Sequence, residues 1–310
     1  MTTLNPIQQS LSQVNLQSTE YLPLSKRKGK LPYTLQYDYF FKAALQLDEA
    51  FLRSFLCSLL HLRPENISSV SIENPIIIGA FSGDKEIVLD AKVLLNTNRL
   101  INLEMQRLNR GDWLERSLVY LCKTFNYIKQ GESYRNVLPT QHIGILNFPL
   151  KQLPEEFYAR YCLMNRKTYE IYSDKLCISV LNLSHTDLAT EEDKLYRLDQ
   201  WAALFKADTW EEIQMLVTKN PDFESIADAL YFLTENRDLL DAYQRHEAEE
   251  AYKKYLEEHA QELDSTVQKQ ALALSEKDAR IAELERLVAE NQHRNKPHPF
   301  SKWKSLLHRH

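Results

Sequence analysis

The chain has 310 residues, 44% of them hydrophobic, and a formal net charge of −5. This length and hydrophobic content are sufficient for one or two globular domains with hydrophobic cores, and they exclude a disordered chain. Residues 1–150 carry 16 basic and 13 acidic side chains, a net +3, whereas residues 151–310 carry 22 and 30, a net −8. The negative total argues against indiscriminate binding to polyanions, while the basic first half is compatible with nucleic-acid contact.

The N-terminal 32 residues are polar and contain the basic cluster SKRKGK at 25–30, which predicts a flexible arm. The first 18 residues, MTTLNPIQQSLSQVNLQS, lack the charged and apolar regions of a signal peptide, and no apolar run of the chain approaches the roughly 18 residues that span a bilayer. We therefore expect a cytoplasmic protein. Four cysteines without C-x-x-C spacing lie in apolar surroundings and are predicted to be reduced and buried, with no zinc site: Cys57, Cys122, Cys162 and Cys177.

The next segment, YDYFFKAALQ at 37–46, predicts a helix. Asp38 lies just before its apolar part, where Asp commonly caps a helix. An alternative is that Asp38 extends the ligand shell of a metal site, and both roles can coexist.

Residues 86–106 predict a β-hairpin. Residues 86–95 alternate with a two-residue period, the turn NTN follows at 96–98, and residues 99–106 alternate again. If the loop is 96–98, the pairing places Asp90 directly opposite Glu104 and Lys92 opposite Asn102.

Directly opposed carboxylates on one face, with Cβ atoms about 4.5–5.5 Å apart, repel each other. A divalent cation would compensate, because Mg²⁺ prefers carboxylate oxygens and keeps sites for water and phosphate. The alternative is an ordinary solvent-facing hairpin in which Asp90 and Glu104 are hydrated or paired with Lys92 or Arg99. A two-residue turn would shift the register and remove the opposition.

A helix is predicted over 112–130, with Asp112 as its N-cap and Gly131 as its stop. One apolar stripe at helical spacing is expected to face the core: Leu114, Leu118, Leu121, Phe125 and Ile128. Arg116, Tyr120 and Gln130 would occupy a different face.

The second half predicts a strand over 176–185 followed by several helices, with Trp201, Leu204 and Phe205 as a packing stripe. Residues 256–291 then show alternating four–three spacing of largely apolar positions, which predicts a coiled coil of about five heptads. Such a helix favours a homo-oligomer; the rival interpretation is a single helix folded back on its own domain. The tail 293–310 is basic and is either disordered or a contact for nucleic acid or an anionic membrane surface.

Three segments in this order resemble a known family: YDYFFKAALQ at 37–46, VLDAKVLLNTNRLINLEMQR at 88–107 and LERSLVYLCKTFNYIKQGESYRNVLPTQHIGILNFPL at 114–150. They are similar to the PD-(D/E)XK nuclease superfamily, and within it to the bacterial recombination-promoting nucleases, the PD-(D/E)XK nuclease family transposases. The resemblance implies an α/β fold with a restriction-endonuclease-like mixed sheet flanked by helices. Here a helical region and a C-terminal coiled coil would follow.

The resemblance also implies a metal-dependent active site that cleaves DNA. Asp90, Glu104 and the backbone carbonyl of Met105 would hold Mg²⁺, with Mn²⁺ as an alternative. Gln106 occupies the place of the superfamily's Lys, and its amide can orient a water but cannot supply positive charge.

The missing charge would come from Lys92 on the neighbouring strand or from Lys42 on the first helix; both are otherwise surface lysines. Substrate contacts are expected from Asp38, Lys42, Arg116 and Gln130.

Two functions are compatible with the sequence. The first is a Mg²⁺-dependent endodeoxyribonuclease of the recombination-promoting or transposase-like type. The second is a catalytically inactive nuclease fold that binds DNA or protein and assembles through its coiled coil. The predicted organisation is a flexible arm (1–32), a nuclease-like domain (33–185), a helical extension (186–250), a coiled coil (251–292) and a basic tail (293–310).

Overall fold

The computed structural model describes residues 22–73, 91–125, 133–235 and 237–294. The chain divides into two units, Met1–Gln244 and Arg245–His310. Two of the predicted site residues, Asp90 and Gln130, lie outside the described residues, as do the predicted helix stop Gly131 and most of the basic tail.

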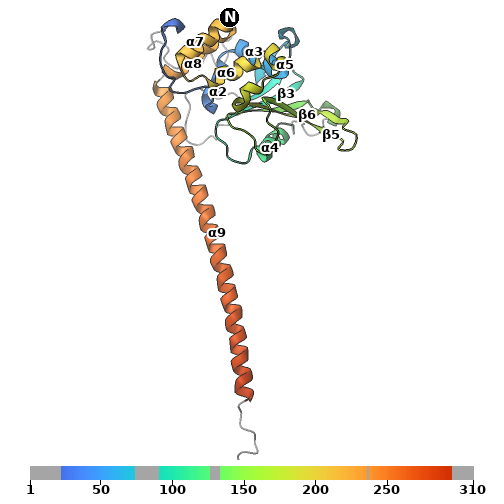
Figure 1. Ribbon diagram of the computed structural model, residues 1–310, viewed down its shortest axis with the longest axis vertical. Helices are drawn as coiled ribbons and strands as arrows, with labels where there is room; N and C mark the ends of the chain where they lie inside the picture. Colours follow the sequence, from blue (N-terminus) through green and yellow to red (C-terminus); the bar gives the residue numbers. More distant parts are fainter. Residues whose placement is uncertain (1–21, 74–90, 126–132, 236, 295–310) are drawn as a thin grey trace, which may run out of the picture. The chain divides into compact units, whose positions relative to one another are not determined.

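The first unit combines helices and strands (Figure 1). The helices are α2 (Asp38–Leu47), α3 (Glu49–Leu60), α4 (Trp113–Phe125), α5 (Glu191–Leu195), α6 (Leu198–Lys206), α7 (Trp210–Lys219) and α8 (Glu224–Glu235). The strands are β1 (Val70–Ile72), β2 (Ala91–Leu95), β3 (Arg99–Gln106), β4 (Thr140–Leu146), β5 (Tyr158–Met164) and β6 (Ile171–Asn182). Helix α9 (Arg237–Arg294) contributes residues to both units.

The six strands found in the described part of the chain form one mixed sheet in the order β1-β2-β3-β4-β6-β5. Pairs β1–β2, β2–β3 and β5–β6 are antiparallel, whereas β3–β4 and β4–β6 are parallel. The parallel pair β3–β4 requires a crossover, which α4 provides. This confirms the predicted mixed sheet flanked by helices.

The predicted hairpin register is confirmed over the described part of β2. Leu95 pairs with Arg99 and Lys92 pairs with Asn102. Asn96 and Thr97 adopt positive φ angles of 49° and 57°, which close the three-residue loop. The side chain of Asn96 also accepts hydrogen bonds from the backbone of Ser68 and Ser69, which ties the loop to the chain before β1.

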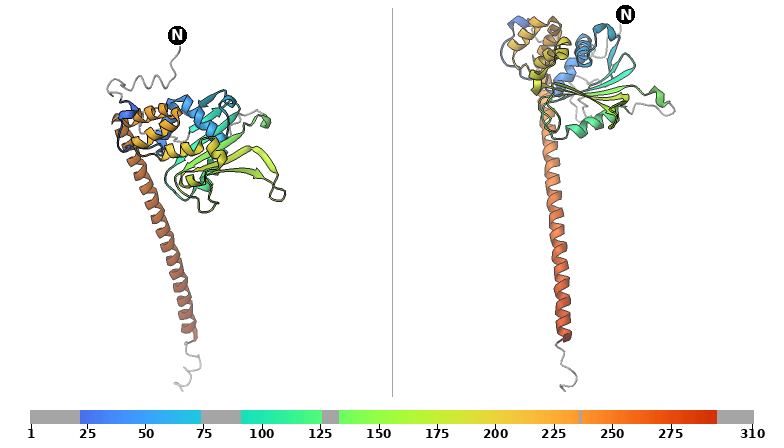
Figure 2. Two further views of the ribbon diagram at one scale, coloured as in Figure 1. Left: turned by 45° about the horizontal axis from the view of Figure 1, so that its top comes forward. Right: turned by 45° about the vertical axis from the view of Figure 1, so that its right-hand side comes forward.

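The two faces of the sheet are packed differently (Figure 2). Ile101, Leu103 and Met105 of β3 belong to the main hydrophobic core, which α2, α3, α6 and α8 cover. Helix α4 covers the other face, where β3 presents Asn102 and Glu104. The alternation of β3 therefore directs its apolar residues to the core and its polar residues to α4.

The helical extension is not a separate domain. The predicted stripe Trp201, Leu204 and Phe205 is buried in the same core as α2 and α3. Ring centroids of Trp201 lie 4.8 Å from those of Phe51 and of Phe55. The predicted boundary at 185/186 therefore does not separate two hydrophobic cores.

Residues 22–32 were predicted to belong to a flexible arm, but in the structure this segment packs against α7 and α8. Arg27 is 1% exposed, forms a 2.6 Å ion pair with Asp228 and donates to the carbonyl of Ala227. Its guanidinium also lies over the rings of Trp210 and Tyr231. One member of the basic cluster is therefore a buried anchor.

Three of the four cysteines are less buried than the sequence predicts. Cys57 is buried, Cys177 is half-buried, and Cys122 and Cys162 are exposed. Cys122 is exposed because α4 turns it away from the sheet, and Cys162 because it is on the edge strand β5. None of the described helices combines the length and apolar composition needed to cross a membrane.

Candidate active site

Glu104 is the acidic residue around which the polar groups of the α4-facing side gather. It is 5% exposed. Nε of Arg116 lies 2.7 Å from Oε1 of Glu104, and Nη2 of Arg116 donates to the hydroxyl of Tyr120 over 3.1 Å. A charge-assisted hydrogen bond of this kind favours the ionised carboxylate and fixes its orientation.

The side of α4 that faces the sheet is more polar than the predicted apolar stripe. Buried on α4 are Trp113, Ser117, Leu121 and Thr124. From the predicted stripe, Leu121 is buried but Leu118 is 54% exposed. The stripe was predicted on a face of the helix rotated by about one residue from the buried face, because the sheet surface beneath α4 carries Asn102, Glu104 and His142, which require polar partners.

Asn102 of β3 and His142 of β4 form a buried hydrogen bond next to Glu104. Both are 0% exposed, and Nδ2 of Asn102 lies 3.0 Å from Nδ1 of His142. Burial, together with the charge of Arg116, lowers the pKa of His142 to about 3, so the imidazole is neutral near pH 7. When Nδ1 accepts from Asn102, the ring proton is on Nε2, which lies 3.6 Å from Oε2 of Glu104. The other tautomer would place a lone pair against the carboxylate.

Close approach of α4 to the sheet depends on Gly144, which pairs with Glu104 across β3 and β4. A Cβ at this position would lie 2.1 Å from atoms of the Trp113 ring. The same ring stacks on His142 with centroids 5.5 Å apart. The absence of a side chain at Gly144 therefore makes room for the indole and sets the distance at which Arg116 reaches Glu104.

Asp38 is a second acidic residue of the site. Burial raises the pKa of its carboxyl to about 7 and the charge of Glu104 adds to this, while Arg110, Arg116 and Arg107 act in the opposite direction. The capping prediction is wrong: α2 begins at Asp38, its N-cap residue is Tyr37, and no side-chain capping hydrogen bond forms there. The carboxyl is instead within the electrostatic reach of Glu104.

The raised pKa of Asp38 predicts a pH-dependent stability without divalent cations. Between its unfolded pKa of about 3.9 and its folded pKa of about 7, the folded state binds a proton that the unfolded state has lost. The free energy of unfolding should therefore fall as pH rises through this window, by up to about 1.4 kcal/mol per pH unit. Asp38→Asn should flatten that slope. Urea denaturation from pH 4 to pH 8 measures it, and parallel curves for the two proteins would contradict the prediction.

The structure brings other predicted residues to the same region. Lys92 is half-buried on the face of Glu104, opposite Asn102. Lys42 is 0% exposed, one helical turn after Asp38, so the surface-lysine alternative is wrong for it. Gln106 is buried, and its Nε2 donates to the carbonyl of Leu108 over 3.1 Å. Met105 directs its side chain into the main core on the opposite face of β3.

Sequence reasoning missed Asn102 and His142. They lie in the strands RLINLEMQ and TQHIGIL, on the sheet face that also carries Glu104. A polar residue within a fully buried stretch of a parallel strand, which must find a buried partner, is the signal that could have found them. Only the parallel register places the two opposite each other.

Within the described residues, no group of three or more His, Cys, Asp or Glu side chains is placed to share a metal ion. Asp90 lies outside those residues. The hard oxygen donors Glu104 and Asp38 suit a divalent cation of the Mg²⁺ type; burial raises the pKa of Asp38 most, and the charge of Glu104 raises it further.

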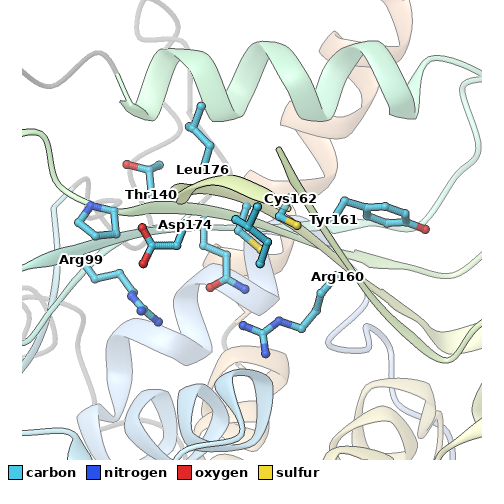
Figure 3. Close-up of a pocket in the computed structure, with 11 residues that line it drawn as sticks. Arg99, Thr140, Arg160, Tyr161, Cys162, Asp174 and Leu176 are labelled. Carbon is cyan, nitrogen blue, oxygen red and sulfur yellow. The ribbon is translucent and has the colours of Figure 1, made fainter. Parts of the chain in front are cut away.

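A pocket of about 320 Å³ lies at the other end of the parallel strands (Figure 3). It includes Arg99 and Thr140 at the beginnings of β3 and β4, together with Arg160 and Cys162 of β5. Because Glu104 and Gln106 are near the carboxyl end of β3, this pocket is distinct from the polar cluster around Glu104.

In a comparison with protein families, a model described as PD-(D/E)XK nuclease family transposase matches residues 35–262. The match includes the whole sheet, the polar cluster around Glu104 and the beginning of α9. No curated protein and no solved structure matches the chain.

Proposed function

We propose that this chain, which belongs to the PD-(D/E)XK nuclease family transposases, is a metal-dependent endonuclease that hydrolyses DNA phosphodiester bonds. The observation that carries the proposal is the buried Glu104 carboxylate, which is oriented by Arg116 and lies close enough to Asp38 to raise its pKa. Two interacting acids among several arginines suit a site where cations and phosphate meet.

The residues that would hold the cation are Asp90, Glu104 and the carbonyl of Met105, with Asp38 extending the shell. Mg²⁺ fits this all-oxygen donor set and Mn²⁺ is the natural substitute. Bound there, the cation would lower the pKa of a coordinated water and neutralise charge on the scissile phosphate.

The chain's own residues bind and orient the substrate. Arg116 reaches Glu104 from α4. Arg107 and Arg110 come just after β3 in the chain, and their positive charges act to lower the pKa of Asp38. These three guanidinium groups attract the DNA backbone, and Arg116 can exchange its carboxylate partner for a phosphate oxygen. Lys92 lies on the face of Glu104, and Lys42 lies one turn after Asp38. We assign both lysines to stabilising charge near the metal-coordinated water. Gln106 would orient that water. Gln130 extends the substrate contacts.

His142 acts as a positioning residue in this proposal. With a pKa of about 3 it is a poor proton acceptor, but its Nε2–H faces Oε2 of Glu104 while Arg116 holds Oε1. Asn102 selects the required tautomer through Nδ1. Partners of this kind, which orient a metal-binding side chain, typically contribute about 10–100-fold to metal affinity or activity.

Two substitutions of His142 separate this role from simple packing. Gln can place an N–H donor near the position of Nε2, whereas Asn reaches only the position of Nδ1. We expect His142→Asn to lower DNA cleavage by about 10–100-fold and His142→Gln to retain most of it. Steady-state cleavage rates, compared with thermal melting of both variants, measure the effect. Equal losses that follow the loss of stability would indicate packing alone.

A nicking assay tests the proposed function. Supercoiled plasmid is incubated with the purified full chain and Mg²⁺, Mn²⁺ or EDTA, beside Asp90→Ala. Cleavage that requires the cation and is lost in the variant supports the proposal. No cleavage by the folded chain with either cation, or equal cleavage by Asp90→Ala, would overturn it.

The second candidate is a non-catalytic nuclease fold that binds DNA or protein. Two contacts favour this candidate. Arg116 already occupies one carboxylate oxygen of Glu104, and the Gln106 amide already donates to the carbonyl of Leu108, so neither side chain is fully available for a metal or a water. DNA retained in a gel-shift assay by a chain that does not nick plasmid would support this candidate.

We also propose that α9 joins copies of the chain in a parallel coiled coil. Along the predicted seam, Leu263, Val267, Leu274 and Ile281 are 53–60% exposed. In this heptad register Arg280 occupies a g position and Glu285 the e position five residues later, while Asp264 occupies a further e position. Parallel helices would pair these opposite charges, whereas antiparallel helices would bring acidic e positions together.

Sedimentation of the full chain tests this assembly. Leu263→Asp combined with Ile281→Asp should shift the oligomer to monomer, because charges would then occupy the seam. Leu272→Asp is the matched control, since Leu272 is 65% exposed but lies outside the seam. An unchanged mass for the double variant would contradict the prediction.

A further inference from the structure

Cys162 and Cys177 are direct partners across the antiparallel pair β5–β6. Side chains of directly opposed residues are on the same face of a sheet. Both cysteines line the 320 Å³ pocket at the end of the sheet away from Glu104. In Figure 3, Cys162 lies on the pocket beside Arg160 and Tyr161.

The hydrogen bonds of the two strands fix the type of this pair. The backbone N–H of Asn182 donates to the carbonyl of Phe157 over 2.8 Å, so these directly opposed residues form a hydrogen-bonded pair. Hydrogen-bonded and non-hydrogen-bonded pairs alternate along an antiparallel ladder. The register is continuous as far as Cys162, five residues beyond Phe157, so Cys162 and Cys177 form a non-hydrogen-bonded pair.

Non-hydrogen-bonded pairs bring their side chains closest, with α-carbons about 4.5 Å apart. A disulfide accepts α-carbon separations of about 4.4–6.8 Å. The backbone of β5 and β6 therefore already satisfies the main geometric requirement for a bond between the two sulfur atoms.

The two thiols also differ in access. Cys162 is exposed on the edge strand, whereas Cys177 is half-buried on the inner strand. Sγ of Cys177 lies 3.9 Å from Oγ of Ser179 and 3.7 Å from the carbonyl oxygen of Ile178. An oxidant that reaches the pocket thus meets Cys162 first, with the second thiol directly opposite.

We propose that Cys162 and Cys177 form a reversible modification site, at which a hydroperoxide converts the two thiols to a cross-strand disulfide. The thiolate of Cys162 attacks the peroxide oxygen, the O–O bond breaks, and sulfenic acid forms at Cys162 while the leaving oxygen departs as water or an alcohol. The thiolate of Cys177 then attacks the Cys162 sulfur, forming the S–S bond and releasing the second oxygen as water. Two thiols are oxidised and one peroxide is reduced.

The disulfide would join β5 to β6 at the last regular pair, because the register becomes irregular between Cys162 and Leu163. It would therefore hold the outer part of this hairpin at the pocket. Since the pocket is at the end of the sheet away from Glu104, the modification does not depend on the nuclease proposal.

Peptide mass spectrometry of the full chain tests the site. Reduced protein is treated with hydrogen peroxide and alkylated, and we expect a cross-linked peptide containing Cys162 and Cys177, lighter by two hydrogen atoms than its separate parts and abolished by dithiothreitol. Cys162→Ser and Cys177→Ser should each remove it, whereas Cys57→Ser and Cys122→Ser should retain it. In Cys177→Ser, dimedone should label Cys162.

The proposal would be overturned if peroxide converts wild-type Cys162 to sulfinic or sulfonic acid without the cross-link. A disulfide that joins two chains, or a cross-linked peptide that persists in Cys162→Ser, would overturn it equally. Unaltered thiols at peroxide concentrations that oxidise exposed Cys122 would do the same.

Discussion

Replacing Glu104 with Gln is expected to reduce metal-dependent DNA cleavage by more than about 100-fold, because outer partners of a metal ligand already contribute about 10–100-fold. Gln has nearly the same size as Glu and can still accept from Arg116, so the packing beneath α4 should be retained. What is lost is the negative charge that would bind a cation. Initial rates of plasmid nicking at saturating Mg²⁺ measure the effect.

Glu115→Gln is the matched control for Glu104. Glu115 is in the first turn of the same helix that carries Arg116, but it is exposed, so its substitution should leave the rate within about twofold. Thermal melting of both variants separates lost chemistry from lost structure. Folded Glu104→Gln that cleaves at the wild-type rate would exclude a catalytic role for the carboxylate.

The largest effect on stability is expected at Arg27. Arg27→Ala should lower the free energy of unfolding by about 2–4 kcal/mol, because it removes charge-assisted hydrogen bonds to Asp228 and Ala227, cation–π contacts and buried side-chain volume. Denaturation in urea, followed by tryptophan fluorescence, measures the change; Trp210 beneath the guanidinium reports directly.

Lys28→Ala provides the matched control, because Lys28 belongs to the same basic cluster but is exposed. Its free energy of unfolding should change by no more than about 0.5 kcal/mol. If Arg27→Ala were as stable as Lys28→Ala, the docking of residues 22–32 on α7 and α8 would contribute nothing measurable. The two variants thus test an anchored segment against a flexible arm.

Local sequence was sufficient to determine the hairpin between β2 and β3. Two-residue alternation and an Asn-Thr-Asn loop allow only a few pairings, and the three-residue loop leads to the observed register. The apolar core stripe of α6 was equally accessible, because large apolar residues at helical spacing have few alternatives to burial. Glu104 could be identified from the two-residue alternation of its strand: when one face of a strand is apolar, an acidic residue of that strand must lie on the opposite face.

Other features were decided only by tertiary structure. The sequence could not show which face of α4 meets the sheet, because the surface beneath that helix is polar and hydrophobic periodicity then misleads, as it did for Leu118. Asn102 and His142 are 40 positions apart, and their pairing depends on the parallel register of β3 and β4.

The buried Arg27 and the opposed Cys162 and Cys177 likewise depend on long-range packing that no local pattern encodes. The sequence by itself determined the strand that carries Glu104, because two-residue alternation is a local pattern, and the order of its motifs carried the resemblance that implied the family and its mixed sheet. Tertiary structure decided which polar side chains surround Glu104, because burial and partner choice depend on segments distant in the chain.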